Sequence, residues 1–175
     1  MSEVNRQALG RRAKTVGNTF ENIINGACLY YRERGAAIIE KTPEPMRPLK
    51  PYGRPGQFIA CFEKQAQPDY KGVLCDGTAI IFEAKHTDAD RIQESVITET
   101  QRSNLDDFKK MGAQCFVMVS MKFQDFYRVP WDVFGNMKFR FGRKYMTGKE
   151  LEPYRLKERK GTVLILEGVE LHESK

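Results

Sequence analysis

The stretch DYKGVLCDGTAIIFEAK, residues 69–85, decides the fold and the chemistry of this chain. Residues 70–75 and 78–85 read as two strands, and Asp76-Gly77 predicts a two-residue hairpin turn between them. Residues i and i+2 of a strand share one face, so Glu83 and Lys85 should point the same way. Asp69 stands just before the first strand. We therefore expect Asp69, Glu83 and Lys85 to meet at one end of the sheet.

Two carboxylates beside an ammonium predict a site for a hard cation. Mg²⁺ takes carboxylate oxygens, and a neighbouring lysine can hold an attacking water or a phosphate oxygen. The plainer interpretations are a turn-initiating Asp69 after Pro68, an exposed strand residue at Glu83, and a Glu83–Lys85 ion pair without catalysis. Glu83, however, follows the apolar run 80–82. A charged residue in a buried strand usually has a function.

Length and composition favour one globular domain. A chain of 175 residues with 41% hydrophobic residues is long enough for one core,. Residues 1–15 are polar, basic and without period, so we expect a disordered arm before a single domain at 16–175. No apolar run approaches the roughly 20 residues that span a membrane, and no signal peptide is evident, which predicts a cytoplasmic protein. The four cysteines form no C-x-x-C pair and are expected to be reduced core thiols,.

Charge is distributed unevenly along the chain. The net charge is +6, and residues 138–160 alone hold nine Lys or Arg against three Glu. Residues 65–113, which contain the expected site, hold nine acidic against six basic groups. An acidic pocket flanked by basic segments suits a metal-dependent enzyme that acts on a polyanion. A solvated basic surface is the alternative.

Periodicity supplies the remaining elements. A helix is expected from Phe20 to Tyr31 with Asn18 as its N-cap, and a second helix opens at a capping box formed by Thr98 and Gln101. Five prolines between residues 43 and 55 predict an irregular basic excursion between two strands. The expected strands are residues 36–41, 58–63, 115–120, 126–129 and 162–166. This order predicts an α/β fold around a mixed sheet.

These elements resemble the PD-(D/E)xK nuclease core, with Pro68 in the place of the motif's proline. Within that superfamily the chain is most similar to the RecU-type Holliday junction resolvases of Gram-positive bacteria and their phages. The resemblance rests on four ordered motifs: GNTFE at 17–21, EKTPEP at 40–45, DYKG at 69–72 and FEAK at 82–85. It covers residues 16–120 well and the remainder more weakly.

The resemblance implies a restriction-endonuclease-like mixed β-sheet core flanked by helices, with a Pro-rich basic stalk at residues 43–57. It also implies a homodimer with two active sites, and Mg²⁺-dependent phosphodiester hydrolysis at four-way DNA junctions, with Mn²⁺ able to replace Mg²⁺. The stalk would enter the junction centre. Contact with a recombinase or with branch-migration machinery is a further expectation, as is a bacterial or phage origin.

Site residues follow from the residues and the resemblance together. Asp69, Glu83 and Glu21 would hold Mg²⁺, a water would attack phosphorus, and Lys85 would offset the developing charge. Glu21 could instead close a capping box with Asn18, and Gln101 could serve Thr98 in the same way or orient water or a phosphate. Expected DNA contacts are Arg47, Lys50 and Arg54 in the stalk and Arg140, Arg143 and Lys144 near the C-terminus. The aromatic residues interleaved with the latter three, Phe139, Phe141 and Tyr145, are assigned to the core.

Two rival functions stay open. A restriction-like or repair nuclease on duplex DNA would keep the core and change the substrate. A DNA-binding recombination accessory protein with a decayed site would keep the basic surface alone. The occupied acidic and lysine positions favour an enzyme over the accessory protein.

Overall fold

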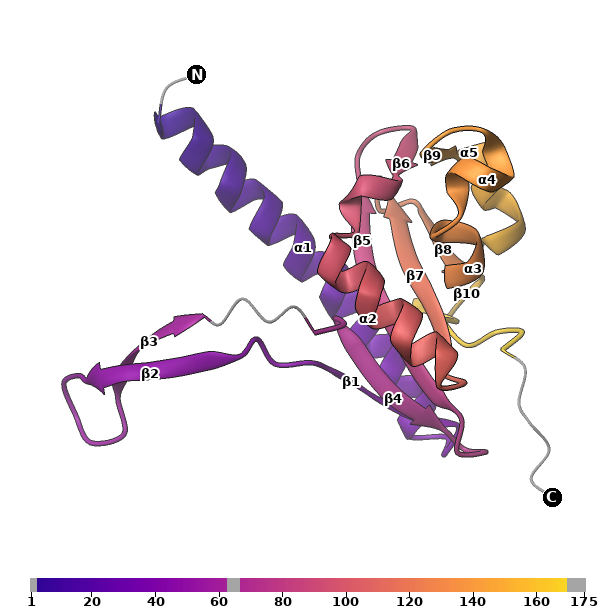
Figure 1. The fold of residues 1–175 in the computed structure, drawn as a ribbon. Helices are drawn as coiled ribbons and strands as arrows, with labels where there is room; N and C mark the ends of the chain where they lie inside the picture. The colour runs from indigo at the N-terminus through magenta and orange to yellow at the C-terminus, as the bar shows by residue number, and fades with distance from the viewer. Residues whose placement is uncertain (1–2, 63–66, 170–175) are drawn as a thin grey trace.

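A five-stranded mixed sheet forms the centre of the computed structural model, which describes residues 3–62 and 67–169 (Figure 1). The strand order is β1 (Ala37–Lys41), β4 (Tyr70–Leu74), β5 (Ala79–Thr87), β7 (Gln114–Met121) and β8 (Asp125–Pro130). β5 and β7 are parallel and the other neighbours are antiparallel. The expected α/β fold around a mixed sheet is therefore confirmed.

The β4–β5 hairpin sets the register of the decisive stretch. Tyr70 pairs with Phe82 and Val73 with Ala79. The loop has three residues rather than the two expected, because the N–H of Leu74 still donates to the carbonyl of Thr78 at 2.9 Å. Gly77 ends this loop with φ +85°, a left-handed conformation that glycine adopts at little cost,. The longer loop keeps Glu83 and Lys85 on the expected face.

Helix α1 (Glu3–Arg32) covers one face of the sheet with its C-terminal half. Phe20, Ile24 and Ala27 are buried there at helical spacing. The helix begins at Glu3, so it includes most of the segment predicted to be a disordered arm, and Asn18 lies inside it rather than at its N-cap. Both predictions are wrong because residues 3–16 contain no proline and many strong helix formers, so the helix continues through a position that could have started it.

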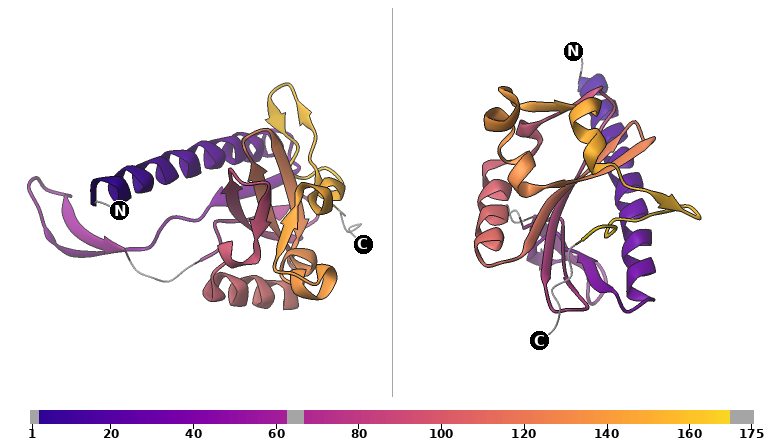
Figure 2. Two further views of the ribbon diagram at one scale, coloured as in Figure 1. Left: turned by 90° about the horizontal axis from the view of Figure 1, so that it is seen from above. Right: turned by 90° about the vertical axis from the view of Figure 1, so that its right-hand side faces the viewer.

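The other face of the sheet carries the remaining helices. α2 (Glu99–Lys110), α3 (Trp131–Phe134), α4 (Met137–Phe141) and α5 (Gly148–Leu151) share a buried cluster with β7 and β8, while α1 belongs to a second cluster (Figure 2). Short elements complete the chain: β6 (Arg91–Gln93), η1 (Glu94–Val96), β9 (Tyr145–Thr147), η2 (Glu152–Tyr154), β10 (Glu158–Arg159) and β11 (Thr162–Val163). The last strand expected, at 162–166, is thus only two residues long. None of the helices in the described ranges has the length and hydropathy needed to cross a membrane.

The Pro-rich excursion is a two-stranded ribbon that projects from the body (Figure 1). β2 (Met46–Pro51) pairs antiparallel with β3 (Phe58–Phe62), with a register shift between Pro48 and Lys50. The expectation that nothing regular survives the prolines is wrong, because each strand of a two-stranded ribbon has a free edge, and a proline there removes no hydrogen bond. The strand expected at 58–63 exists, but it belongs to this ribbon and not to the central sheet.

Candidate active site

Asp69, Glu83 and Lys85 converge at the junction of β4 and β5, as the sequence predicts. Lys85 Nζ donates to Glu83 Oε2 at 2.9 Å and lies 3.5 Å from Asp69 Oδ2. The backbone N–H of Ala84 donates to the same Asp69 oxygen at 2.9 Å. Tyr70 pairs with Phe82 across the hairpin, and Asp69 precedes Tyr70 while Glu83 follows Phe82. The hairpin register therefore brings the two carboxylates together.

Glu83 is the most constrained carboxylate of the group. Its side chain is 0% exposed, and Oε1 has no hydrogen-bond partner among the described residues. Burial, followed by the charge of Asp69, raises the pKa of Glu83 to about 8, although Lys85 opposes the shift,. The pKa of Lys85 is also raised, because the two carboxylates outweigh its burial. An ionised Glu83 therefore needs more positive charge than Lys85 alone supplies.

Gln101 joins the cluster from the first turn of α2. Its side-chain nitrogen donates to Glu83 Oε2 at 2.5 Å. Its side-chain oxygen accepts from the backbone N–H of Thr98 at 3.1 Å, and Thr98 Oγ1 accepts from the backbone N–H of Gln101 at 3.3 Å. The capping box, one of the two roles that the sequence left open for Gln101, is therefore present, and the same side chain also contacts Glu83. The other role, orienting water or a phosphate, stays a prediction. The cap fixes the orientation in which Gln101 presents its amide.

Glu21, on α1, is paired with a residue outside the cluster. Lys41 Nζ, at the end of β1, donates to Glu21 Oε2 at 2.5 Å. The hydroxyl of Tyr70 donates to the backbone carbonyl of Glu21 at 3.3 Å, which ties α1 to the residue that follows Asp69. The alternative of a capping box at Glu21 is wrong, since this residue lies inside α1. Lys41 and Tyr70 are contacts that the sequence analysis missed, because both depend on how α1 packs against the sheet.

The donor set fits a divalent cation through Asp69 and Glu83. A buried, unpartnered carboxylate oxygen next to a second carboxylate is a pair of hard ligands with a deficit of positive charge,. Glu21 would need to leave Lys41 to become a third ligand. Within residues 3–62 and 67–169, no three Asp, Glu, His or Cys side chains already stand at metal-binding spacing.

Stacked aromatic rings in the core hold the two carboxylates in place. The rings of Tyr70 and Phe82, which adjoin Asp69 and Glu83 in sequence, stack with centroids 4.8 Å apart and planes within 7°. Phe82 stacks in turn on Phe116 at 4.7 Å. The acidic pair therefore sits on a continuous column of buried aromatic rings, and its geometry depends on core packing rather than on a loop.

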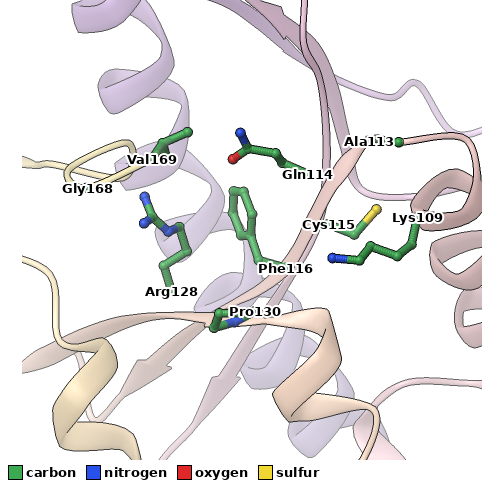
Figure 3. Close-up of a pocket in the computed structure, with 10 residues that line it drawn as sticks. Lys109, Ala113, Gln114, Cys115, Phe116, Arg128, Pro130, Gly168 and Val169 are labelled. Carbon is green, nitrogen blue, oxygen red and sulfur yellow. The ribbon is translucent and has the colours of Figure 1, made fainter. Parts of the chain in front are cut away.

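A separate cavity of about 400 Å³ lies at the start of β7, where Phe116 lines it (Figure 3). Arg128 and Lys109 approach it from opposite sides, and the guanidinium of Arg128 donates to the carbonyl of Ile165 at 2.9 Å. Its lining residues are Lys109, Gly112, Ala113, Gln114, Cys115, Phe116, Arg128, Pro130, Gly168 and Val169. Because none of the described lining residues is a carboxylate, this cavity is distinct from the cluster of Asp69 and Glu83.

The expected DNA-binding residues occupy two separate places. Arg47 and Lys50 are exposed on the β2 strand of the ribbon, and Arg54 is exposed in the turn that follows. Arg140 lies on α4 and donates to the backbone carbonyl of Asp132 at 3.2 Å. Arg143 pairs with Glu150 at 2.5 Å, and Lys144 is exposed. The pairing of Arg143 makes it the least available of the three C-terminal cations.

One aromatic residue departs from its expected place in the core. Phe139 is 92% exposed on α4, whereas Phe141 and Tyr145 are partly buried. Helical periodicity cannot place a residue on a helix of five residues, so the sequence carried no reliable signal for this exposure.

Comparison with known proteins gives a family match over most of the chain. The model of the family described as "RecU: Recombination protein U" matches residues 15–170. A "Holliday junction resolvase RecU" of Streptococcus gordonii is 33% identical over 59% of this chain and 54% of its own length. One from Geobacillus sp. (strain WCH70) is 29% identical over 79% of this chain and 73% of its own length.

These matches differ in extent. The chain spans about half the length of several relatives, such as the Pediococcus pentosaceus protein, which is 32% identical over 59% of this chain and 53% of its own length. A solved structure of Archaeoglobus fulgidus Hjc, described as a Holliday junction resolvase, aligns with a TM-score of 0.49 and 13% identity. That alignment covers 79% of this chain and 93% of the other.

Proposed function

The chain belongs to the RecU family, and from this premise we propose that it is a Mg²⁺-dependent endonuclease that resolves four-way DNA junctions by paired phosphodiester hydrolysis. The observation that carries the proposal is the convergence of Asp69, Glu83, Lys85 and Gln101 at the junction of β4 and β5. The names of the relatives supply the junction as substrate.

Asp69 and Glu83 would hold the Mg²⁺ ion, with Mn²⁺ able to replace it, and Glu21 would join them on leaving Lys41. When bound, the ion supplies a Lewis acid and lowers the pKa of water in the site. The positive charge also relieves the cost of ionising Glu83, whose pKa is raised to about 8,. This supports Glu83 as a ligand rather than a purely structural residue.

Lys85 and Gln101 act from the protein side. Lys85 stands between the two carboxylates and can turn its remaining N–H groups towards the phosphate that they face, where it would stabilise negative charge on phosphoryl oxygens. Gln101, held by the α2 cap, keeps one oxygen of Glu83 in a fixed orientation. Both residues preorganise the site before DNA arrives.

Substrate selection would come from the ribbon and from symmetry. The β2–β3 ribbon presents Arg47, Lys50 and Arg54 together with exposed apolar side chains, and it would enter the junction centre as a stalk,. A homodimer would place two active sites on opposed strands, because its two-fold axis matches that of the junction. Contact with a recombinase or branch-migration protein remains part of this proposal.

The decisive test compares cleavage of junction, fork and duplex DNA in Mg²⁺. We expect preferential cutting of the junction, and loss of at least roughly a hundredfold in rate for Asp69→Asn with junction binding retained. Asp107→Asn, an equivalent change on the exposed surface of α2, serves as the control and should cut normally.

Two results would exclude the proposal. Equal cutting of duplex and junction would point to a restriction-like or repair nuclease. Binding without cutting by the unmodified protein would point to a recombination accessory protein.

A further inference from the structure

Helix α4 exposes an aromatic ring to solvent, although the helix begins at a buried residue. Phe139 is 92% exposed, while Met137, two residues earlier, is 0% exposed and packs in the core. The helix ends at Gly142 in a left-handed conformation with φ +70°. Burial of Phe139 contributes almost nothing to the stability of this fold, so the exposed ring needs another explanation.

Two hydrogen bonds fix α4 to the segments that carry the catalytic cluster. Arg102, the neighbour of Gln101, donates to the carbonyl of Gly135 at 3.0 Å, just before α4. The N–H of Glu94, in the segment between Lys85 and Gln101, donates to the carbonyl of Lys144 at 2.9 Å, just after α4. The position of α4 relative to the cluster is therefore set from both ends.

The strands that carry Asp69, Glu83 and Lys85 at their junction, β4 and β5, lie between α4 and the ribbon in Figure 1. In Figure 1 and in the left view of Figure 2 the β2–β3 ribbon projects from one side of the central sheet and α4 lies on the opposite side. DNA with its branch point at the ribbon and its scissile phosphate at the cluster would continue along the arm towards α4. This step rests on the proposed function.

Charge and chemistry define what α4 would contact on that arm. Lys138 and Arg140 flank Phe139 and are exposed, and the nearby carboxylate of Asp132 is paired with Lys109 at 2.7 Å. Cations of this kind meet phosphates, but a phenyl ring has no favourable partner on the charged backbone. Apolar side chains that enter the minor groove instead insert between adjacent base pairs.

We infer that Phe139 is a specificity-determining residue that inserts from the minor groove into one base step of the arm that carries the scissile phosphate. Lys138 and Arg140 hold the phosphates on either side of that step. Insertion unstacks the step, and pyrimidine–purine steps such as TA and CA unstack most easily. The protein should therefore cut best where such a step lies at one fixed distance from the cleaved bond.

The test uses junctions in which a single TA step is moved along an otherwise GC-rich arm. The unmodified protein should show one position at which cleavage efficiency is raised roughly tenfold, and Phe139→Ala should lose that peak. Phe139→Trp, which keeps an aromatic wedge, should retain it. Leu29→Ala removes an exposed apolar side chain from α1 on the other face of the sheet, and is expected to leave the profile unchanged.

Salt dependence separates the wedge from its flanking cations. Phe139→Ala should weaken junction binding without changing the slope of log affinity against log salt, whereas Lys138→Ala should reduce that slope by about one. A profile of Phe139→Ala that matches the unmodified protein overturns the inference. So does a change of oligomeric state in this variant, which would make Phe139 a protein–protein contact. If the unmodified protein fails to prefer junctions at all, the proposed function fails instead.

Discussion

Replacement of Glu83 by glutamine should stabilise the metal-free protein while removing its activity. The carboxyl of Glu83 is fully buried with one unpartnered oxygen, and its pKa is raised to about 8 from an ordinary value of 4.5. The folded protein therefore keeps this proton over a pH range in which the unfolded chain has lost it. The contribution of Glu83 to stability is fully present below about pH 4.5 and is lost as pH rises towards 8.

The size of the effect follows from the gap between the two pKa values. At pH 7 the unfolded carboxyl is ionised and the folded one is still protonated, a difference of about 3 kcal/mol. Glutamine at position 83 does not titrate, so Glu83→Gln should exceed the unmodified protein in stability by up to this amount. For a chain of this size the melting temperature should rise by roughly 5–10 °C at pH 7.

The assay is urea or thermal unfolding in EDTA at about pH 5, 7 and 8.5. The gain in the free energy of unfolding of Glu83→Gln over the unmodified protein should grow with pH, because the unfolded carboxyl ionises while the folded one still holds its proton. Glu94→Gln provides the contrast: this carboxylate also has a buried unpartnered oxygen, but its other oxygen pairs with Arg102 at 2.5 Å. Its loss should lower stability by about 2 kcal/mol. A gain for Glu83→Gln that is independent of pH, or no gain at all, would refute the reasoning.

Three further predictions concern the scaffold and the ligand set. Gly72→Ala should prevent normal β1–β4 pairing, because an added Cβ would lie 2.2 Å from the carbonyl oxygen of Ile38; circular dichroism and melting should show a loss of several kcal/mol. Thr98→Ala should cost about 1 kcal/mol by removing the α2 cap but retain more cleavage than Gln101→Ala, which also removes the amide at Glu83,. Lys41→Met should free Glu21 and lower the Mg²⁺ concentration needed for half-maximal cleavage; an unchanged or higher requirement would remove Glu21 from the ligand set.

Local pattern was enough to predict the centre of the site. The hairpin and the two-residue period of a strand place Asp69, Glu83 and Lys85 together with no knowledge of the rest of the chain. The capping box at Gln101 was equally local. Its second contact, with Glu83, follows from the docking of α2 against β5 and was not predicted; the family resemblance pointed only to a role for Gln101 in the site.

The errors arose where two local rules competed or where pairing was long-range. Asn18 fits an N-cap, but it also tolerates a helix interior, and the helix formers before it extended α1 to Glu3,. The prolines at 43–55 argued against regular structure, yet a ribbon with free edges accommodates them. The Lys41–Glu21 pair and the exposure of Phe139 depend on how distant elements meet, which composition and spacing do not encode.

The aromatic column beneath the acidic pair links the temperature limit of catalysis to that of the domain. Tyr70, Phe82 and Phe116 belong to the same buried cluster as α1, so the carboxylates cannot drift apart by a local opening. Heat should therefore abolish turnover only when the whole domain melts, and amides of β4 and β5 should exchange with solvent solely through global unfolding.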